Sequence, residues 1–233
     1  MQLNTKCMWL STCFITFTVT SALAEEAPKS VNEQLVDSLT TLSGGPHAGF
    51  RSNHAKGIVT TGLFTPAASA ASVSKAAHLQ TATTPVIVRF SNATGVPNIP
   101  DANGNAFPKG IAIRFQLPDS EITDMVCISV NGFPAATPED FLGLLNAVAA
   151  SGPEAAKPTP VEQFLGSHPA ALAFVKTPKL PPVSFATQPF FGVNAFKFIN
   201  AKGETRYGRY RIEPVSGAQF LSQEAAEKAA PNY

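Results

Sequence analysis

Between residues 58 and 130 the chain contains four short segments that are rich in β-branched and aromatic residues and are bounded by turn residues. They run from Ile58 to Phe64, Val86 to Phe90, Ile111 to Leu117 and Met125 to Val130. Turns rather than long helices separate these segments. Parallel strands need long crossover connections, so this spacing predicts an antiparallel meander or barrel.

Helical patterns lie before and after this region. Apolar residues at helical spacing predict a helix from Ser30 to Ser43, and Thr137 followed by Pro138 has the pattern of a helix N-terminus. Two further strands joined by a hairpin turn, and a final helix, are predicted at Gly192–Ile199, Arg206–Ile212 and Ala218–Ala230. These elements predict an α+β fold with an antiparallel sheet and surrounding helices.

The first 24 residues have the pattern of a secretory signal peptide. Lys6 precedes an apolar run from Met8 to Val19, and Ala22-Leu23-Ala24 forms a small-residue cleavage site. A short membrane anchor is the alternative interpretation, but the run is too short for a stable one. We therefore expect a signal peptide at residues 1–24 and one domain over residues 25–233, periplasmic or secreted, with no stable membrane anchor.

The mature chain predicted in this way has one cysteine and no net charge. Cys7 and Cys13 fall within the signal, so Cys127 has no partner for an intramolecular disulfide. The formal net charge of +1 falls to zero when Lys6, the only charged residue of the signal, is removed. Nothing in this composition indicates a surface for nucleic acid or for anionic membranes.

A single histidine lies between fixed cations in the segment Arg51-Ser52-Asn53-His54-Ala55-Lys56-Gly57. An imidazole can exchange a proton near neutral pH, so His54 is a candidate acid or base. The alternative is that His54 is a partly buried histidine on a strand, with no role in chemistry.

This segment, with Gly62-Leu63-Phe64 after it, resembles the distal-histidine strand of the haem catalase family, whose pattern is R-x-x-H-A-K-G followed by G-x-F. Two later stretches are similar to further blocks of that family: Val88–Phe115, with its V-R-F-S motif, and Phe191–Tyr207. The resemblance runs from about Pro46 to about Pro214 and is closest to the small catalase-related peroxidases. It implies an antiparallel β-barrel of catalase type with helices around it, and haem b as the cofactor.

The resemblance implies catalytic roles for two residues. His54 would be the distal base, because an imidazole close to both oxygens of a peroxide can carry a proton from one to the other. Ser91, the serine of the V-R-F-S motif, would orient the imidazole ring. The alternative for Ser91 is an ordinary strand serine that bonds to the backbone.

Three further residues would hold the haem if the resemblance extends to them. Arg51 and Arg89 match the arginines that bind the propionates, a role suited to the planar guanidinium fork. The alternative for Arg89 is a salt bridge at the rim of the barrel. Phe141 corresponds to the aromatic residue on the distal haem face, although a phenylalanine on an amphipathic helix is often a core residue.

One departure from the family pattern concerns a distal asparagine. The alignment places Ile128 where full-length catalases carry this asparagine, and Asn131 follows in the sequence. An asparagine at this position helps to hold peroxide, so its loss is expected to weaken oxidation of a second peroxide molecule most. The substitution therefore predicts peroxidase activity with weak catalase activity.

A second departure concerns the proximal iron ligand, which is a tyrosinate in catalases. The family carries this tyrosine in a helix beyond the segment that resembles Arg206–Arg211, and the tyrosines of this chain are Tyr207, Tyr210 and Tyr233. None of them matches the proximal motif. The metal ligand is therefore unknown, and we expect the C-terminal haem-ligand helix to be missing from this sequence.

The expected function is that of a haem peroxidase that reduces hydrogen peroxide or an organic hydroperoxide with a small organic electron donor. One alternative is a haem-free or inactive β-barrel fragment that binds an apolar ligand, since barrels of this size can hold one small molecule. Another is an isomerase of the allene-oxide-synthase type on the same barrel. Members of the family often form oligomers, so this chain could do so as well.

Overall fold

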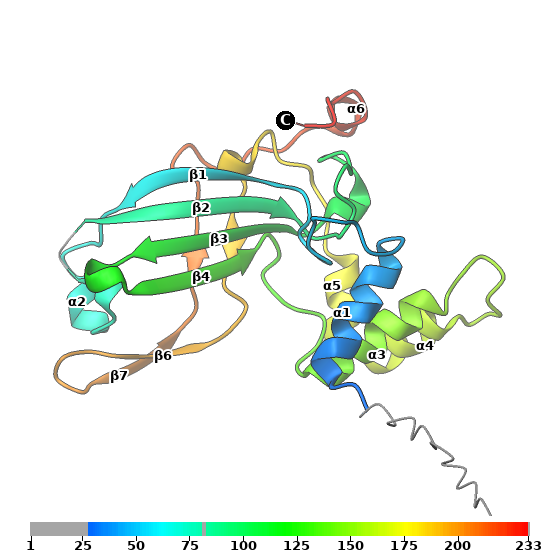
Figure 1. Ribbon diagram of the computed structural model, residues 1–233, viewed down its shortest axis with the longest axis horizontal. Coiled ribbons are helices and arrows are strands. Elements are labelled where there is room, and N and C mark those ends of the chain that lie inside the picture. Colours follow the sequence, from blue (N-terminus) through cyan, green and yellow to red (C-terminus); the bar gives the residue numbers. More distant parts are fainter. Residues whose placement is uncertain (1–27, 81–82, 233) are drawn as a thin grey trace, which may run out of the picture.

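The computed structural model describes residues 28–80 and 83–232. The expected signal peptide therefore lies outside the described residues. A curved antiparallel sheet forms one end of the molecule and a group of helices forms the other (Figure 1). Among the described helices, none combines the length and the apolar character needed to cross a bilayer.

The sheet begins with the meander that the sequence predicts. Its antiparallel strands follow the order β1-β2-β3-β4-β5-β8. They comprise β1 (Gly57–Phe64), β2 (Thr84–Asn92), β3 (Lys109–Gln116), β4 (Ile122–Ile128), β5 (Phe190–Phe191) and β8 (Arg211–Ile212). The prediction of an antiparallel meander is confirmed, although β4 begins at Ile122 rather than at Met125.

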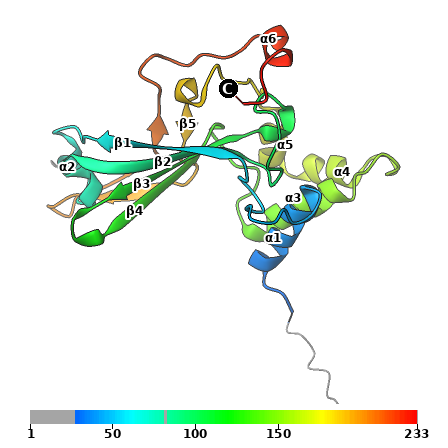
Figure 2. The same cartoon turned by 45° about the horizontal axis from the view of Figure 1, so that its top comes forward.

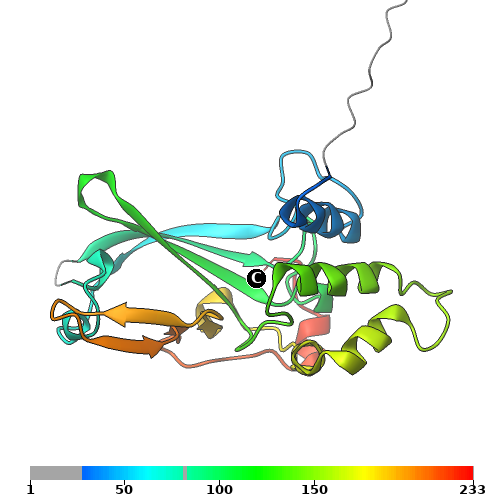
Figure 3. The same cartoon turned by 90° about the horizontal axis from the view of Figure 1, so that it is seen from below.

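The prediction of a closed barrel is wrong for the part of the chain that the structure describes. In that part β1 pairs only with β2, and β8 pairs only with β5. The strands β6 (Phe196–Ile199) and β7 (Thr205–Gly208) pair with each other as a separate hairpin, which lies below β4 in Figure 1 and is seen from below in Figure 3. The hairpin strands bond to each other and not to the strands at the ends of the main sheet.

The main core lies on one face of the sheet. Ile111, Cys127 and Phe190 pack there with Phe185, and Val86 and Phe115 form a second cluster nearer the other end of β2 and β3. Alternate residues point to the opposite face, as expected for strands. On that face Val59, Leu63 and Val126 are 65%, 74% and 71% exposed. Cys127 is a free, buried thiol.

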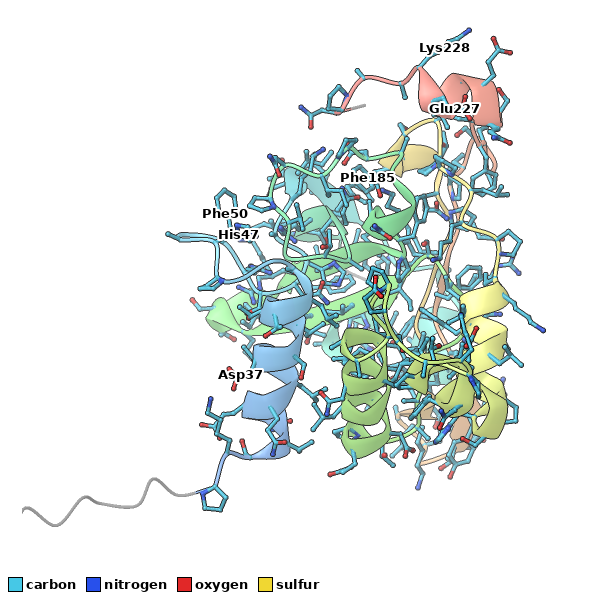
Figure 4. All side chains as sticks on the ribbon, turned by 90° about the vertical axis from the view of Figure 1, so that its right-hand side faces the viewer. Asp37, His47, Phe50, Phe185, Glu227 and Lys228 are labelled. Atoms are coloured by element: carbon cyan, nitrogen blue, oxygen red, sulfur yellow. The ribbon has the colours of Figure 1, made fainter. Side chains whose placement is uncertain are left out.

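Two of the helices begin at the residues that the sequence predicts. Helix α1 (Val31–Leu42) starts at a capping box in which Ser30 and Glu33 bond to each other's backbone N–H. Helix α3 (Pro138–Ala149) starts where Thr137 Oγ1 accepts the N–H of Asp140 at 3.1 Å. Helix α1 packs against α3, which packs against α4 (Pro160–Ser167), followed by α5 (Pro169–Lys176), as Figure 2 and Figure 4 show from two directions.

The remaining helices are short. Helix α2 (Ala70–Val73) follows β1, and α6 (Gln223–Glu227) is the only helical part of the predicted segment Ala218–Ala230 within the described residues. The helix starts late because the chain before Ser222 is extended, with Phe220 forming an isolated bridge to Pro182. The tail then returns to the sheet, where Pro231 O accepts the N–H of Asp101 at 2.9 Å.

Candidate functional site

His54 lies in a tight turn immediately before β1 rather than on a strand. Its φ of 55° falls in the left-handed region, which non-glycine residues rarely adopt. Two hydrogen bonds fix the turn. The Asn53 side chain accepts one from the His54 N–H at 3.0 Å, and Ala55 N donates the other to Thr94 O at 2.9 Å. Strained backbone of this kind is concentrated at functional sites.

The His54 ring rests on two neighbouring strands. Its Nδ1 lies 3.0 Å from Ser91 Oγ, which is the contact that the catalase resemblance implies. The strand register places Ser91 of β2 beside Gly110 of β3. A Cβ atom on Gly110 would lie 2.8 Å from His54 Cε1 and 3.0 Å from Ser91 Oγ. Gly110 therefore leaves the space in which the ring sits, a role that the sequence did not reveal.

Arg89 stabilises the His54 turn through hydrogen bonds to its backbone. Its Nη2 donates to His54 O at 2.7 Å and to Ala55 O at 3.4 Å. Gly57 leaves room for this guanidinium, because a Cβ there would lie 2.9 Å from Arg89 Nη2. The alternative role of Arg89 in a rim salt bridge finds no support in the described residues, whose ion pairs involve neither Arg89 nor Arg51.

The electrostatic environment keeps the His54 imidazole neutral. Burial, together with the smaller effects of the positive charges of Arg89 and Arg51, lowers the pKa of His54 to about 4. Burial also lowers the pKa of Arg89, with a smaller effect from Arg51. Because Nδ1 contacts Ser91, Nε2 is the nitrogen that remains for exchange of a proton with a substrate.

A buried lysine fixes the strands under this ring. Lys109 is fully buried, and its Nζ donates to Asn92 Oδ1 at 2.6 Å and to Asp101 O at 2.5 Å. Asn92 and Lys109 are the sequence neighbours of Ser91 and Gly110, so the same contacts hold the two residues that support His54. Burial lowers the pKa of Lys109 to about 8.

Lys56 belongs to this network and not to the surroundings of the imidazole. Lys56 Nζ lies 3.0 Å from Asp101 Oδ1 and donates to Ile99 O and Pro231 O, each at 2.7 Å. The network therefore connects the His54 segment to the C-terminal tail.

Ile128 lies in the same row of the sheet as the residues under His54. It pairs with Gly110 of β3, which in turn pairs with Ser91 of β2, so the three residues point to one face. Asn131 is held elsewhere, because its Oδ1 accepts a hydrogen bond from Arg209. Ile128 is therefore in line with the residues that support His54, and the Asn131 side chain is bound to Arg209.

Phe141 is not brought to His54 by any contact among the described side chains. It is half-buried on α3, and its ring centroid lies 5.0 Å from that of Phe133. Both rings line a cavity of about 480 Å³ together with Leu35 of α1. This position fits the alternative interpretation of Phe141 as a residue that packs between helices.

The described tyrosines lie away from the histidine site. Tyr207 is 75% exposed on β7. Phe191 of β5 pairs with Ile128 and with Arg211, so it continues the row of paired residues that contains Ser91. Gly192 N donates to Tyr210 O in the next pair along the strands. Because neighbouring residues of a strand point to opposite faces, Tyr210 points away from the face that carries Ser91. Tyr233 is outside the described residues. A proximal iron ligand is therefore not identified among residues 28–80 and 83–232.

Comparison with known proteins agrees with this arrangement. The chain is 33% identical over 204 residues to a catalase-related peroxidase of Mycolicibacterium paratuberculosis, which covers 86% of this chain and 63% of that protein. It is also 33% identical to a catalase-related peroxidase of Synechococcus elongatus, over 84% of this chain and 58% of the relative. This chain thus spans about three fifths of the length of these relatives.

Solved structures show the same fold. A fungal catalase superposes with a TM-score of 0.65 at 22% identity, covering 91% of this chain and 43% of that one. The family model described as Catalase matches residues 45–232, which include the His54 turn and every strand of the sheet. The chain therefore belongs to the catalase family.

Proposed function

We propose that this protein is a haem peroxidase of the catalase-related type. It reduces hydrogen peroxide or an organic hydroperoxide with a small organic electron donor and has weak catalase activity. The observation that carries this proposal is the His54 site: a neutral imidazole held by Ser91, seated over Gly110 and supported by Arg89.

The residues around His54 fit the distal half of a haem site. Arg51 lies close enough to Arg89 to contribute to the lowered pKa of Arg89, and neither arginine forms an ion pair with a described carboxylate. Two cations of this kind would hold the anionic propionates of haem b. The bound haem would supply the redox-active iron, whose protein ligand is not located in the described residues.

The chain's own residues would manage the proton. The neutral His54 ring accepts a proton from one peroxide oxygen at Nε2 and returns it to the other oxygen as the O–O bond breaks. Ser91 fixes the ring at Nδ1, and Arg89 fixes the turn that carries it. With a pKa of about 4, the base stays available through the neutral and mildly acidic range.

Ile128 supports the expectation of weak catalase activity. An aliphatic side chain beside the Ser91–Gly110 row cannot hydrogen-bond to a second peroxide molecule. We further propose that the mature protein is periplasmic or secreted, on the basis of the signal-peptide pattern in residues 1–24.

A hemin titration of the purified mature chain tests the proposed function. We expect one equivalent of hemin to bind, and we expect Arg51→Ala to weaken binding by about tenfold because a propionate loses its charged partner. Arg206→Ala, which changes an exposed arginine on β7, is the matched control and should bind hemin like the wild type. Absence of stoichiometric binding, or equal effects of the two variants, would contradict the proposal.

A further inference from the structure

A slot lies in the sheet between β4 and the β6–β7 hairpin. Strand β4 pairs with β3 along its whole length, but with β5 only at Ile128 and Phe191. The edge of β4 before Ile128 therefore has no strand beside it among the described residues. A cavity of about 440 Å³ occupies this place and reaches from β4 to Phe196 and Phe198 of β6.

The β4 side of the slot exposes backbone hydrogen-bonding groups. Ser129 N donates to Lys109 O and Leu117 N donates to Glu121 O, so the odd-numbered residues of β4 bond to β3. Even-numbered residues of an antiparallel strand then direct N–H and C=O to the other side. Asp124 and Val126 are the even-numbered residues that line the cavity, and among the described strands none pairs with their backbone N–H and C=O groups on that side.

A buried histidine and a tyrosine close the inner end of the slot. His78 is 6% exposed, and its ring packs against Phe115 with centroids 4.7 Å apart. Its Nε2 lies 3.5 Å from the hydroxyl of Tyr210, at the outer limit for a hydrogen bond. These two polar groups therefore satisfy each other poorly, and both line the same cavity.

Aromatic rings form the opposite wall. Tyr210 meets Phe196 and Phe198 edge to face, with centroids 5.3 and 5.5 Å apart. Rings arranged in this way favour a further aromatic ring over an aliphatic chain, because edge and face carry opposite partial charges. The wall therefore favours a flat aromatic ligand.

The interior of the slot is electrically neutral. Burial lowers the pKa of His78 and raises the pKa of Tyr210 and of the Cys127 thiol, so all three are uncharged near neutral pH. The charged side chains at the slot lie at its rim: Lys197 is exposed, and Asp124 is paired with Arg114 at 2.7 Å. A charged ligand would lose its hydration here without gaining a buried partner.

We propose that this slot is a binding site for a small uncharged phenol. The phenol ring packs against the aromatic wall, and its hydroxyl bonds with Tyr210 and His78. The site lies on the face of the sheet opposite Ser91 and does not require haem. Binding of a phenol can therefore be tested independently of the proposed function.

Equilibrium dialysis of the purified mature chain against 4-methylphenol tests this site. We expect saturable binding of one equivalent, about fivefold to tenfold weaker in Tyr210→Phe, which removes one hydrogen bond and keeps the ring. Tyr207→Phe makes the same chemical change at an exposed position of β7 and should bind like the wild type.

Toluene has the same ring and methyl group without the hydroxyl, and we expect it to bind at least tenfold more weakly than 4-methylphenol. Three results would overturn the proposal: no saturable binding of the phenol, equal affinities for Tyr210→Phe and the wild type, or toluene binding as tightly as the phenol.

Discussion

A histidine lies at each end of the sheet, and the two are held in different ways. His78 lies among the rings of Phe64 and Phe115, and burial alone lowers its pKa. His54 has a strained turn, a hydroxyl at 3.0 Å and two arginines whose charges add to the effect of burial. Burial makes a histidine neutral at either end, but only the His54 end also aligns the ring with fixed polar groups.

The two ends also differ in what stabilises them. At the His78 end, apolar contacts among Val86, Phe115 and Leu117 form the core. At the His54 end, the fully buried Lys109 and its polar partners occupy the same strands. The predictions below use this difference, since each variant should affect one end of the sheet and spare its matched control.

The largest effect is expected for His54→Gln in the haem-loaded protein. Glutamine retains polarity but cannot transfer the proton, so peroxidase turnover should fall by about 10²- to 10⁴-fold. Steady-state oxidation of a chromogenic donor measures this change. His168→Gln alters a histidine stacked on Phe164 of α4 and should leave turnover within about twofold of the wild type, a margin of about 0.4 kcal/mol. Comparable losses of turnover in both variants would show that His54 does not transfer the proton.

The second prediction concerns the buried lysine. Lys109→Ala removes the buried donor to Asn92 Oδ1 and Asp101 O and should lower the free energy of unfolding by about 2–6 kcal/mol, since each buried acceptor that loses its donor costs about 1–3 kcal/mol. Urea unfolding followed by circular dichroism measures this value. Lys202→Ala, on the exposed hairpin turn, should change it by less than about 0.5 kcal/mol. If Lys109→Ala leaves the free energy of unfolding unchanged, apolar packing alone stabilises this end of the sheet.

Gly110→Ala should have a smaller effect of the same kind. Its added methyl group meets the His54 ring at 2.8 Å, and overpacking of this sort costs about 1–3 kcal/mol. Gly62→Ala is the control on β1, where the nearest atom is 3.6 Å away, in ordinary contact. The difference between the urea midpoints of Gly110→Ala and Gly62→Ala reports how much stability is lost by crowding His54. Equal midpoints would contradict the close contact between Gly110 and the His54 ring.

The smallest effect is expected for Ile128→Asn. An amide beside the Ser91–Gly110 row can hydrogen-bond to peroxide, so oxygen evolution should rise severalfold while peroxidase turnover stays the same. An oxygen electrode measures the first activity and donor oxidation the second. If oxygen evolution does not change, Ile128 is not the reason for weak catalase activity.

Local patterns predicted the parts of the fold that local forces determine. Apolar residues at helical spacing identified the helix after Ser30, Thr137 followed by Pro138 identified the start of another, and β-branched segments bounded by turn residues identified the strands of the meander. The closed barrel was wrong because closure depends on which distant edges pair. Nothing in the sequence of β6 and β7 shows that they bond only to each other among the described strands.

The candidate site, like the fold, was predicted only in part. The motif identified His54, Ser91 and Arg89, and the structure brings these three together. It could not show that Gly110 makes room for the ring, or that Lys56 meets Asp101, because these contacts join segments far apart in the chain. Phe141 was placed by resemblance alone, and its described contacts lie among the helices.

Titration of His54 by NMR in the purified chain, with the His54→Gln variant used to assign its ring signal, is the most direct test of the proposed neutral base. We expect a pKa of about 4, so the ring stays neutral at pH 6 and gains its proton only on further acidification. Because an unfolded histidine titrates near 6.5, the folded state should also lose stability as the pH falls from about 6.5 toward 4. A His54 ring that titrates at its ordinary value would contradict the account, because the base would then be neither buried nor governed by Arg89 and Arg51.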